Sequence, residues 1–262
     1  MIEVLKSADD LARQKWDVLI PTMGALHPGH QSLIKLAKNY GEKIVVSIFV
    51  NPLQFENKID LENYPKTIET DMQMAMDAGA TAVFAPSEEE IYPSKIEQVN
   101  AGELGDLFEG AARVGHFSGV LTVVKRLFDL VKPKHAIFGE KDFQQLFLIK
   151  EMVEKLQLPV NIVSAPTIRD ANNLALSSRN LRLSESEKKT ANVIFQALST
   201  NSLEKAKEVI NGQPLFQLDY LNLIDEETFK DAGPATKSKR LIIAGWVNQV
   251  RLIDNKAVGG KQ

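Results

Sequence analysis

Between residues 17 and 164, short runs of β-branched and apolar residues alternate with segments in which apolar residues recur every three or four positions. The runs predict strands and cover residues 17–20, 43–50, 81–85, 135–139 and 160–164. The segments between them predict amphipathic helices: one after residue 27, one with the face Ile68, Met72, Ala75 and Met76, one with the face Val120, Val123, Val124, Leu127 and Val131, and one with the face Leu146, Ile149, Val153 and Leu156. This alternation predicts an α/β fold with a Rossmann-like, doubly wound parallel sheet.

The pattern changes after Pro166. Ser184 and Glu187 have the spacing of a capping box, and the helical face Ala191, Ile194, Phe195 and Leu198 follows them. Alternating segments at 218–224, 241–247 and 250–253 then predict strands. We therefore expect a doubly wound domain over residues 1–165 and a smaller α+β domain over residues 166–262. The Pro- and Gly-bearing stretch 86–119 is expected to be a long connection, the usual place for substrate-binding loops.

The tetrapeptide His27-Pro28-Gly29-His30 stands between the first of these strands and the helix that follows it. Pro28 suits the first helical position, and Gly29 allows a flat group to approach the backbone. Two imidazoles three residues apart share one side of the first turn, where unpaired backbone N–H groups and the helix dipole favour an anion. An isolated pair of histidines is more often structural, but the strand–turn–helix context favours a phosphate site here.

Composition narrows the class of partner. The chain has 262 residues, 44% of them hydrophobic, which is enough for a full globular core. With 31 basic and 34 acidic residues its net charge is −3, which favours neither nucleic acid nor an anionic membrane as a partner. It has no cysteine, and it shows no signal-peptide core or membrane-length apolar run. We expect a cytoplasmic protein with a small substrate.

Four further motifs follow in order along the chain: Asn-Pro-Leu-Gln-Phe at 51–55, Gly-His-Phe-Ser-Gly-Val at 115–120, Phe-Gly-Glu-Lys-Asp-Phe-Gln-Gln at 138–145 and Leu-Ser-Ser-Arg-Asn at 176–180. With the histidine motif, they make nearly the whole chain resemble the pantothenate synthetases, or pantoate–β-alanine ligases, of the H-x-G-H nucleotidyltransferase superfamily. The resemblance implies that the pantoate carboxylate attacks the α-phosphorus of ATP, and that β-alanine then displaces AMP from pantoyl adenylate. It also implies Mg²⁺, a homodimer, a first domain that binds nucleotide and pantoate, and a second domain that acts as a lid.

The same resemblance implies roles for individual residues. The catalytic set is His27, His30, Lys141 and Arg179, with cations that follow charge onto the departing phosphate. The implied ATP-binding positions are Met23, Gly24, Ala25, Leu26, His27, Pro28, Gly29, His30, Gly139, Glu140, Lys141, Asp142, Ile168, Leu176, Ser177, Ser178 and Arg179. Gln54 and Gln145 are implied to bind pantoate and β-alanine, because neutral amides both donate and accept without burying a charge.

A second group of residues has a weaker basis. Asn51, Glu109 and Arg113 are expected to line the pocket, the last two as a lid pair, and Asp71 is expected to contact the metal through water. His116 and His135 are assigned to structure, one in a Gly-flanked turn and the other at the head of a strand. The chain departs from the family pattern at Val114, at Lys66 and in the loop 56–60, which affects loop rigidity and the finer metal and phosphate contacts.

Two other functions remain open from the sequence. An H-x-G-H adenylyl- or cytidylyltransferase with another acceptor shares the histidines and the Ser-Ser-Arg loop but does not need the two glutamines. A catalytically silent nucleotide-binding module does not need Lys141 or Arg179. RNA binding is disfavoured by the net charge and by the lack of a basic stripe.

Overall fold

The computed structural model describes residues 2–56, 58–94 and 96–259. It divides into two compact units, one formed by residues 1–140 and 145–166 and the other by residues 141–144 and 167–262. The short segment 141–144 therefore groups with the second unit, although it precedes the last part of the first unit in the chain.

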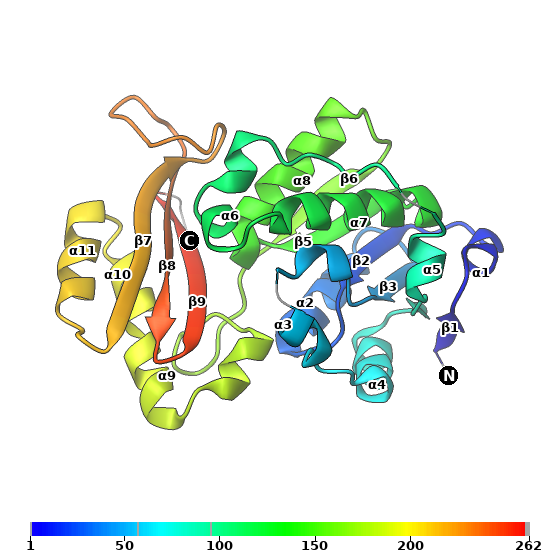
Figure 1. Ribbon diagram of the computed structural model, residues 1–262, viewed down its shortest axis with the longest axis horizontal. Helices are drawn as coiled ribbons and strands as arrows, with labels where there is room; N and C mark the ends of the chain where they lie inside the picture. The colour runs from blue at the N-terminus through cyan, green and yellow to red at the C-terminus, as the bar shows by residue number, and fades with distance from the viewer. Residues whose placement is uncertain (1, 57, 95, 260–262) are drawn as a thin grey trace. The chain divides into compact units, whose positions relative to one another are not determined.

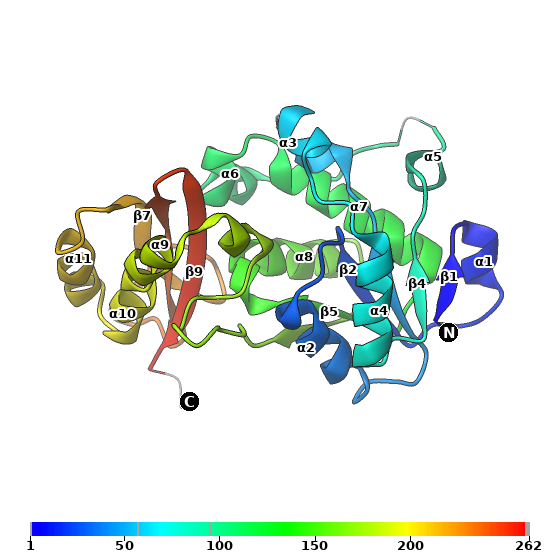
Figure 2. The same ribbon diagram turned by 90° about the horizontal axis from the view of Figure 1, so that it is seen from below.

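The described strands of the first unit form a six-stranded sheet in the order β1-β4-β3-β2-β5-β6, and every neighbouring pair is parallel (Figure 1; β4 is labelled in Figure 2). The strands are β1 (Glu3–Leu5), β2 (Val18–Thr22), β3 (Ile44–Ile48), β4 (Ala82–Phe84), β5 (His135–Gly139) and β6 (Asn161–Ala165). The chain adds strands on one side of β2 and then returns to its other side with β5. The predicted doubly wound, Rossmann-like sheet is thus confirmed, with its topological switch point between β2 and β5.

Helices cover both faces of this sheet. The first unit contains α1 (Ala8–Ala12), α2 (Pro28–Ala37), η1 (Pro52–Gln54), α3 (Lys58–Glu62), α4 (Ile68–Ala78), α5 (Glu88–Ile91), η2 (Glu103–Asp106), α6 (Glu109–Ala112) and α7 (His116–Val131), while η3 (Glu140–Asp142) and α8 (Phe143–Lys155) lie across the division between the units. Helices α2 and α4 pack on the face that carries Val18, Ile20 and Val46, and α7 lies on the opposite face (Figure 2). Alternate strand residues therefore face opposite helices, as a strand's period of two requires.

Strands β2 and β5 pair only near their amino-terminal ends. The register joins Val18 to His135 and Leu19 to Ala136, whereas β2 pairs with β3 along its whole length. Val18 N–H donates to Lys43 O on the β3 side, so the alternate residues 19 and 21 direct their backbone groups towards β5. Pro21 has no N–H to donate on that side. The missing donor coincides with the end of pairing, and the two strands separate towards the carboxyl edge where ligands bind in open α/β sheets.

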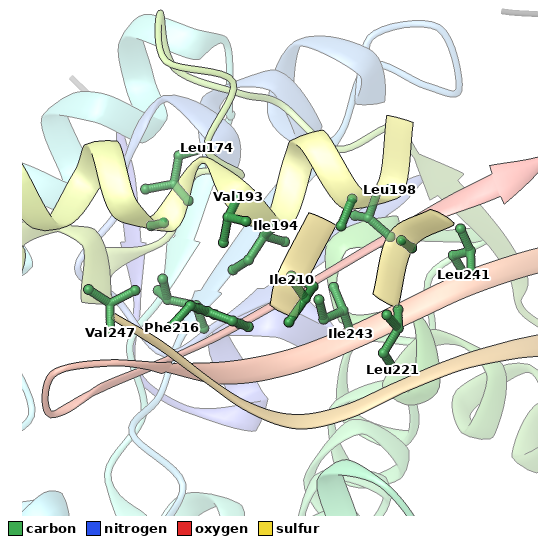
Figure 3. Close-up of a cluster of buried hydrophobic side chains, with 14 of the residues drawn as sticks. Leu174, Val193, Ile194, Leu198, Ile210, Phe216, Leu221, Leu241, Ile243 and Val247 are labelled. Carbon is green, nitrogen blue, oxygen red and sulfur yellow. The ribbon is translucent and has the colours of Figure 1, made fainter. Parts of the chain in front are cut away.

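The second unit has its own sheet and core. Its elements are η4 (Ser178–Arg182), α9 (Glu185–Ala191), α10 (Val193–Ser199), α11 (Leu203–Asn211), β7 (Phe216–Asp225), β8 (Lys239–Val247) and β9 (Val250–Val258). The three strands form an antiparallel sheet in the order β7-β8-β9. Ile194 and Leu198 of α10 and Ile210 of α11 pack with Leu221, Leu241 and Ile243 of the sheet (Figure 3). The predicted α+β fold of this part of the chain is confirmed.

Several local predictions are corrected. Residues 86–119 are not one long connection, because they contain α5, η2, α6 and the first turn of α7. The helix after the confirmed Ser184–Glu187 capping box ends at Ala191, and a second helix begins at Val193. In α4 Ala75 is buried and Met72 packs against the core, as predicted, and Asp71 and Ala78 are buried as well, whereas Ile68 is 40% exposed. A carboxylate in the buried position shifts the helix face relative to the apolar pattern, and its partners explain why it is tolerated there.

The sequence pattern also missed β1 and α1, which are too short to show periodicity. Of the departures from the family pattern, Val114 is 71% exposed and Lys66 is also exposed. The loop 56–60 lies partly outside the described residues, because Asn57 and the side chains of Lys58 and Asp60 are not among them.

Candidate active site

Helix α2 begins with a reciprocal cap made by two histidines. Gly29 N–H donates to Nδ1 of His27 at 3.1 Å, and His27 N–H donates to Nδ1 of His30 at 3.3 Å. The two ring centroids lie 4.1 Å apart. Because each Nδ1 accepts a hydrogen bond, the neutral form of each ring carries its hydrogen on Nε2. Each imidazole is thereby set as a donor through Nε2, the polarity that a phosphate oxygen requires.

The backbone of this turn differs from the sequence-based expectation of unpaired N–H groups. Gly29 N–H is taken by the His27 ring, and His30 N–H donates to His27 O at 2.8 Å. Pro28 has no N–H. The expectation was wrong because the His27 imidazole occupies the N-cap position and accepts the orphan amide, as a Ser or Asp side chain would. The two rings and the helix dipole remain as the features that favour an anion.

The loop between β2 and α2 rests on the carboxylate of Asp71, which is 1% exposed. Its Oδ2 accepts from Ala25 N–H at 2.9 Å and its Oδ1 accepts from Leu26 N–H at 2.7 Å, while the Thr67 hydroxyl donates to Oδ2 at 3.1 Å. Gly24 has φ +82°, and a Cβ there would lie 2.9 Å from Asp71 Oδ2. Asp71 thus has a structural role that the sequence did not predict. Its contact with a metal through water stays a prediction.

Gln54, in the 3₁₀ turn after β3, lies against the same loop. Its Nε2 is 2.9 Å from Sδ of Met23, which immediately precedes Gly24. Asn51 caps this turn and donates from Nδ2 to Gln54 Oε1 and to Gly119 O, both at 3.1 Å. The structure therefore brings together two sets of residues that are far apart in sequence: an amide predicted to bind the acceptor substrate, and the loop predicted to bind ATP.

His116 supports this turn from α7. Arg113 Nη1 lies 2.8 Å from its Nε2, and its Nδ1 lies 3.0 Å from Gln54 O. Arginine only donates and a carbonyl only accepts, so the neutral ring carries its hydrogen on Nδ1. His116 is buried, which agrees with a structural role, although it lies in the first turn of a helix. The predicted pocket residue Arg113 caps α6 and Glu109 is buried within it. Their action as a lid pair stays a prediction.

In the second unit a pocket brings together two motifs that lie 36 positions apart in the sequence. It is lined by the polar residues Lys141, Ser177, Arg179, Asn180, Arg251 and Asp254 and by the apolar residues Leu174, Ala175, Ile194, Leu252 and Ile253. Ser177 Oγ accepts from Arg179 N–H at 3.3 Å, and its hydroxyl hydrogen can still donate. The pocket therefore offers ammonium, guanidinium and hydroxyl donors, which suit a polyanion.

Arg251 in this pocket was not singled out from the sequence. Its guanidinium donates to Asp219 Oδ2 through Nη2 at 2.5 Å and stacks 5.4 Å from the centre of the Trp246 ring. The available signal was its place between apolar Val250 and Leu252, which puts it on the polar face of a strand. Alternation of this kind predicts which face of the strand Arg251 lies on, but it does not predict a binding site.

Lys141 is held from strand β9. Asn255 Nδ2 donates to Lys141 O at 2.9 Å, and the Lys141 ammonium lies 3.8 Å from Asp142 Oδ2. The neighbouring Asp254 accepts two hydrogen bonds from Arg169, at 2.6 and 3.0 Å. The backbone of Lys141 is thus fixed by the second sheet, and its ammonium lies beside the carboxylate of Asp142.

The other predicted site residues are placed as follows. Gly139 ends β5, Glu140 follows it, and Gln145 is a partly buried residue of α8 in the first unit. Leu176 N–H donates to Ile168 O at 2.9 Å, which closes a short antiparallel turn in front of Ser178. The binding roles of these residues stay predictions.

The described residues were compared with the requirements of a protein-held metal site and of a membrane-spanning helix. Among residues 2–56, 58–94 and 96–259, no group of three or more His, Cys, Asp or Glu side chains is arranged to hold a metal ion. Within the same part of the chain, none of the helices combines the length and the apolar composition needed to cross a bilayer.

Comparison with known proteins identifies the family. Residues 2–257 match the family model described as pantoate-beta-alanine ligase. The pantothenate synthetase of Acidothermus cellulolyticus is 45% identical over 253 residues, which cover 90% of this chain and 83% of that protein. The crystal structure of pantothenate synthetase from Thermus thermophilus aligns with a TM-score of 0.91 and 39% identity, covering 98% of this chain and 99% of the other.

A third relative carries ligands. The pantoate-beta-alanine ligase from Francisella tularensis, solved in complex with beta-gamma ATP and beta-alanine, aligns with a TM-score of 0.84 and 34% identity over 100% of this chain and 99% of its own. Similarity of this extent in both sequence and fold shows that the chain belongs to the pantoate–β-alanine ligase family.

Proposed function

We propose that this chain condenses pantoate with β-alanine at the expense of ATP, through a pantoyl-adenylate intermediate, and releases AMP and pyrophosphate. The family assignment supports the reaction. The observation that carries the proposal onto this chain's own residues is the contact between Gln54 Nε2 and Met23 Sδ. It sets an amide suited to a hydroxy acid directly beside the loop that leads to the His27–His30 cap.

The first step forms the adenylate. A carboxylate oxygen of pantoate attacks the α-phosphorus of ATP, the new P–O bond forms, and the bond from the α-phosphorus to the bridging oxygen breaks to release pyrophosphate. Negative charge increases on the departing oxygen. We propose that His27 and His30 donate to phosphate oxygens through Nε2, the nitrogen that their reciprocal cap leaves protonated.

The second step forms the amide. The β-alanine amine attacks the acyl carbon of the adenylate, the C–N bond forms, and the C–O bond to AMP breaks as the amine loses a proton. Adenylation makes the carboxyl oxygen a good leaving group and holds it beside the incoming amine. We propose that Gln54 and Gln145 orient pantoate and β-alanine during the two steps.

The second unit is proposed to supply cations. Lys141, Ser177 and Arg179 line one pocket, and together with Ser178 they are the donors we assign to the phosphates. Met23 to Gly29, Gly139, Glu140, Asp142, Ile168 and Leu176 complete the proposed ATP site. Ser177 and Arg179 lie at the start of one 3₁₀ turn, so a single local movement of that turn shifts both donors together.

Magnesium is proposed as the partner of ATP. Mg²⁺ keeps several waters and binds mainly through substrate phosphates, so it needs few protein ligands. Asp71 is the predicted protein contact, through water, and its Oδ1 has acceptor capacity beyond the bond from Leu26 N–H. When bound, the ion neutralises charge on the departing pyrophosphate.

Two further properties are part of the proposal. We propose a homodimer, so that sedimentation equilibrium is expected to give about twice the 29.1 kDa mass of one chain. We also propose a cytoplasmic location, where ATP is available as the substrate. A mass equal to that of one chain at micromolar concentration contradicts the dimer.

The test of the reaction is isotope exchange between pyrophosphate and ATP. Exchange is expected to require pantoate and not β-alanine, because only the first step is reversible without the amine. His30→Ala is expected to lower the exchange rate by about 100- to 1,000-fold, the usual cost of removing a donor from a developing oxyanion, while ATP binding is retained.

Lys35→Ala is the matched control, because Lys35 is an exposed residue on the same helix. A stable nucleotidyl product in place of AMP contradicts the ligase and favours another H-x-G-H transferase. Unchanged exchange in the His30 variant contradicts the catalytic role of the cap.

A further inference from the structure

Asn51 is the centre of a buried hydrogen-bond cluster. Asn51 is only 1% exposed, and its side-chain amide takes part in four hydrogen bonds. Oδ1 accepts from Leu53 N–H at 3.2 Å and from the Tyr92 hydroxyl at 2.8 Å, and Nδ2 donates to Gln54 Oε1 and Gly119 O at 3.1 Å each. Every donor and acceptor of this amide is therefore used.

The backbone decides which way this amide points. Leu53 N–H can only donate, so the atom facing it is the Asn51 oxygen, and Gly119 O can only accept, so the atom facing it is the nitrogen. A flipped amide leaves both backbone groups unsatisfied in the interior, at the full cost of desolvation. The orientation of Asn51 is thus determined by groups that have no alternative polarity.

That polarity passes to Gln54. Because Asn51 donates through Nδ2, the Gln54 atom that faces it is the accepting Oε1. Gln54 Nε2 therefore points away from Asn51, towards Met23 Sδ. A thioether is a weak acceptor. An oxygen of a bound ligand is a better hydrogen-bond acceptor for the same N–H group. Gln54 is therefore oriented to donate a hydrogen bond to pantoate.

Tyr92 holds the far side of Asn51. It caps the C-terminal end of α5, 41 positions along the chain, and its ring packs edge-on against Phe49 at a centroid distance of 6.0 Å. Burial, with a smaller effect from the charge of Glu88, raises the pKa of Tyr92 above its usual range. The hydroxyl therefore keeps its hydrogen near neutral pH and donates to Asn51 Oδ1.

We propose that Tyr92 is a positioning residue for pantoate. Tyr92 acts through Asn51, which holds Gln54 as a hydrogen-bond donor. Gln54 then recognises an oxygen of pantoate that accepts a hydrogen bond. This is either a carboxylate oxygen or a hydroxyl oxygen that accepts through a lone pair. This inference rests on the proposed function.

The test is Tyr92→Phe, which keeps the ring and its packing and removes only the hydroxyl. Loss of one hydrogen bond that positions Gln54 is expected to raise KM for pantoate about fivefold, with kcat changed less than about twofold and KM for ATP unchanged. Tyr40→Phe is the control, because Tyr40 is an exposed tyrosine of the same unit that packs on His135. It is expected to alter none of these constants.

A second variant tests the route. If Tyr92 acts through Asn51, then Tyr92→Phe adds no further increase in KM for pantoate to an Asn51→Ala background. Equal rises in KM for ATP and pantoate, or a lower melting temperature with unchanged KM, indicate a merely structural tyrosine and overturn the proposal. The KM result of the single variant decides this even if Asn51→Ala does not fold.

The outcome for the wild-type protein separates the two proposals. Absence of pantoate-dependent exchange in the wild type contradicts the proposed function itself. Pantoate-dependent exchange in the wild type, together with an unchanged KM in Tyr92→Phe, contradicts only the positioning role of Tyr92.

Discussion

Asp71 shows how one buried carboxylate shapes the candidate site. Its two oxygens accept the Ala25 and Leu26 amides and the Thr67 hydroxyl, and they hold a loop in which Gly24 and Ala25 both have positive φ. Asp71→Asn replaces one acceptor by a donor, so one loop amide loses its partner. Because hydrogen bonds to a charged group contribute about 1.5–3 kcal/mol, we expect the free energy of unfolding to fall by about 2 kcal/mol.

The same variant is expected to lower the rate of pyrophosphate–ATP exchange, because the loop it releases leads directly to His27. Denaturant unfolding and exchange kinetics measure the two effects. Asp77→Asn is the control, since Asp77 is an exposed residue of the same helix whose carboxylate accepts a hydrogen bond from Gln73 Nε2 at 2.7 Å. An Asp71 variant as stable and active as this control contradicts the role of the loop anchor.

At the scale of elements, Asp17 joins the beginnings of three strands. Its Oδ2 accepts from the Glu42 and Lys43 amides ahead of β3, and its Oδ1 accepts from the Lys134 ammonium ahead of β5. The Lys134 side chain, followed by the Lys43 amide, lowers the pKa of Asp17 below its usual value. A depressed carboxyl pKa stabilises the fold above the unfolded pKa, and the stabilisation is lost as the pH falls through the folded value.

Asp17→Asn is therefore expected to reduce stability by about 1–2 kcal/mol at pH 7 and by much less near pH 3, where the wild-type carboxyl is increasingly protonated. Urea unfolding at the two pH values measures the difference. Asp129→Asn removes an exposed ion pair with Lys125 and is expected to have little effect at either pH. A deficit in Asp17→Asn that is the same at both pH values contradicts the assignment.

At the scale of the whole molecule, the two compact units have separate hydrophobic cores. The first core lies between α2, α4 and the parallel sheet, and the second between α10, α11 and the antiparallel sheet. The chain has two tryptophans, Trp16 in the first unit and Trp246 in the second. Single-tryptophan variants, Trp246→Phe and Trp16→Phe, therefore report on the two units separately.

Leu198→Ala creates a cavity in the second core, where Leu198 is fully buried, and is expected to cost about 2–5 kcal/mol. We expect the unfolding midpoint to fall more when Trp246 is the reporter than when Trp16 is. Leu181→Ala, at a position 89% exposed in the same unit, is the control and is expected to shift neither midpoint. Equal shifts at both reporters show that the units unfold together.

Local patterns along the chain were enough to predict the class of fold and the positions of the motifs on its elements. Strand and helix periodicity along residues 17–164 predicted the doubly wound sheet, because side chains on one face of an element recur at fixed intervals. Pro28 after His27 marked the start of α2, and Ser184 with Glu187 marked the start of α9, because helix ends need caps from nearby residues. The motifs also indicated the family, which the comparisons confirm.

Local patterns did not reveal which distant residues support these motifs, because that depends on contacts made in the folded chain. From the sequence, Asp71 was expected only to contact the metal through water, whereas in the fold its carboxylate accepts the amides of a loop 45 and 46 positions away. Tyr92 and Asn255 carried no signal for the same reason, since each acts through a contact with a residue far along the chain. Periodicity and capping are local properties of the chain, whereas the polarity of Gln54 and the placement of Lys141 depend on which backbone groups the fold leaves facing them.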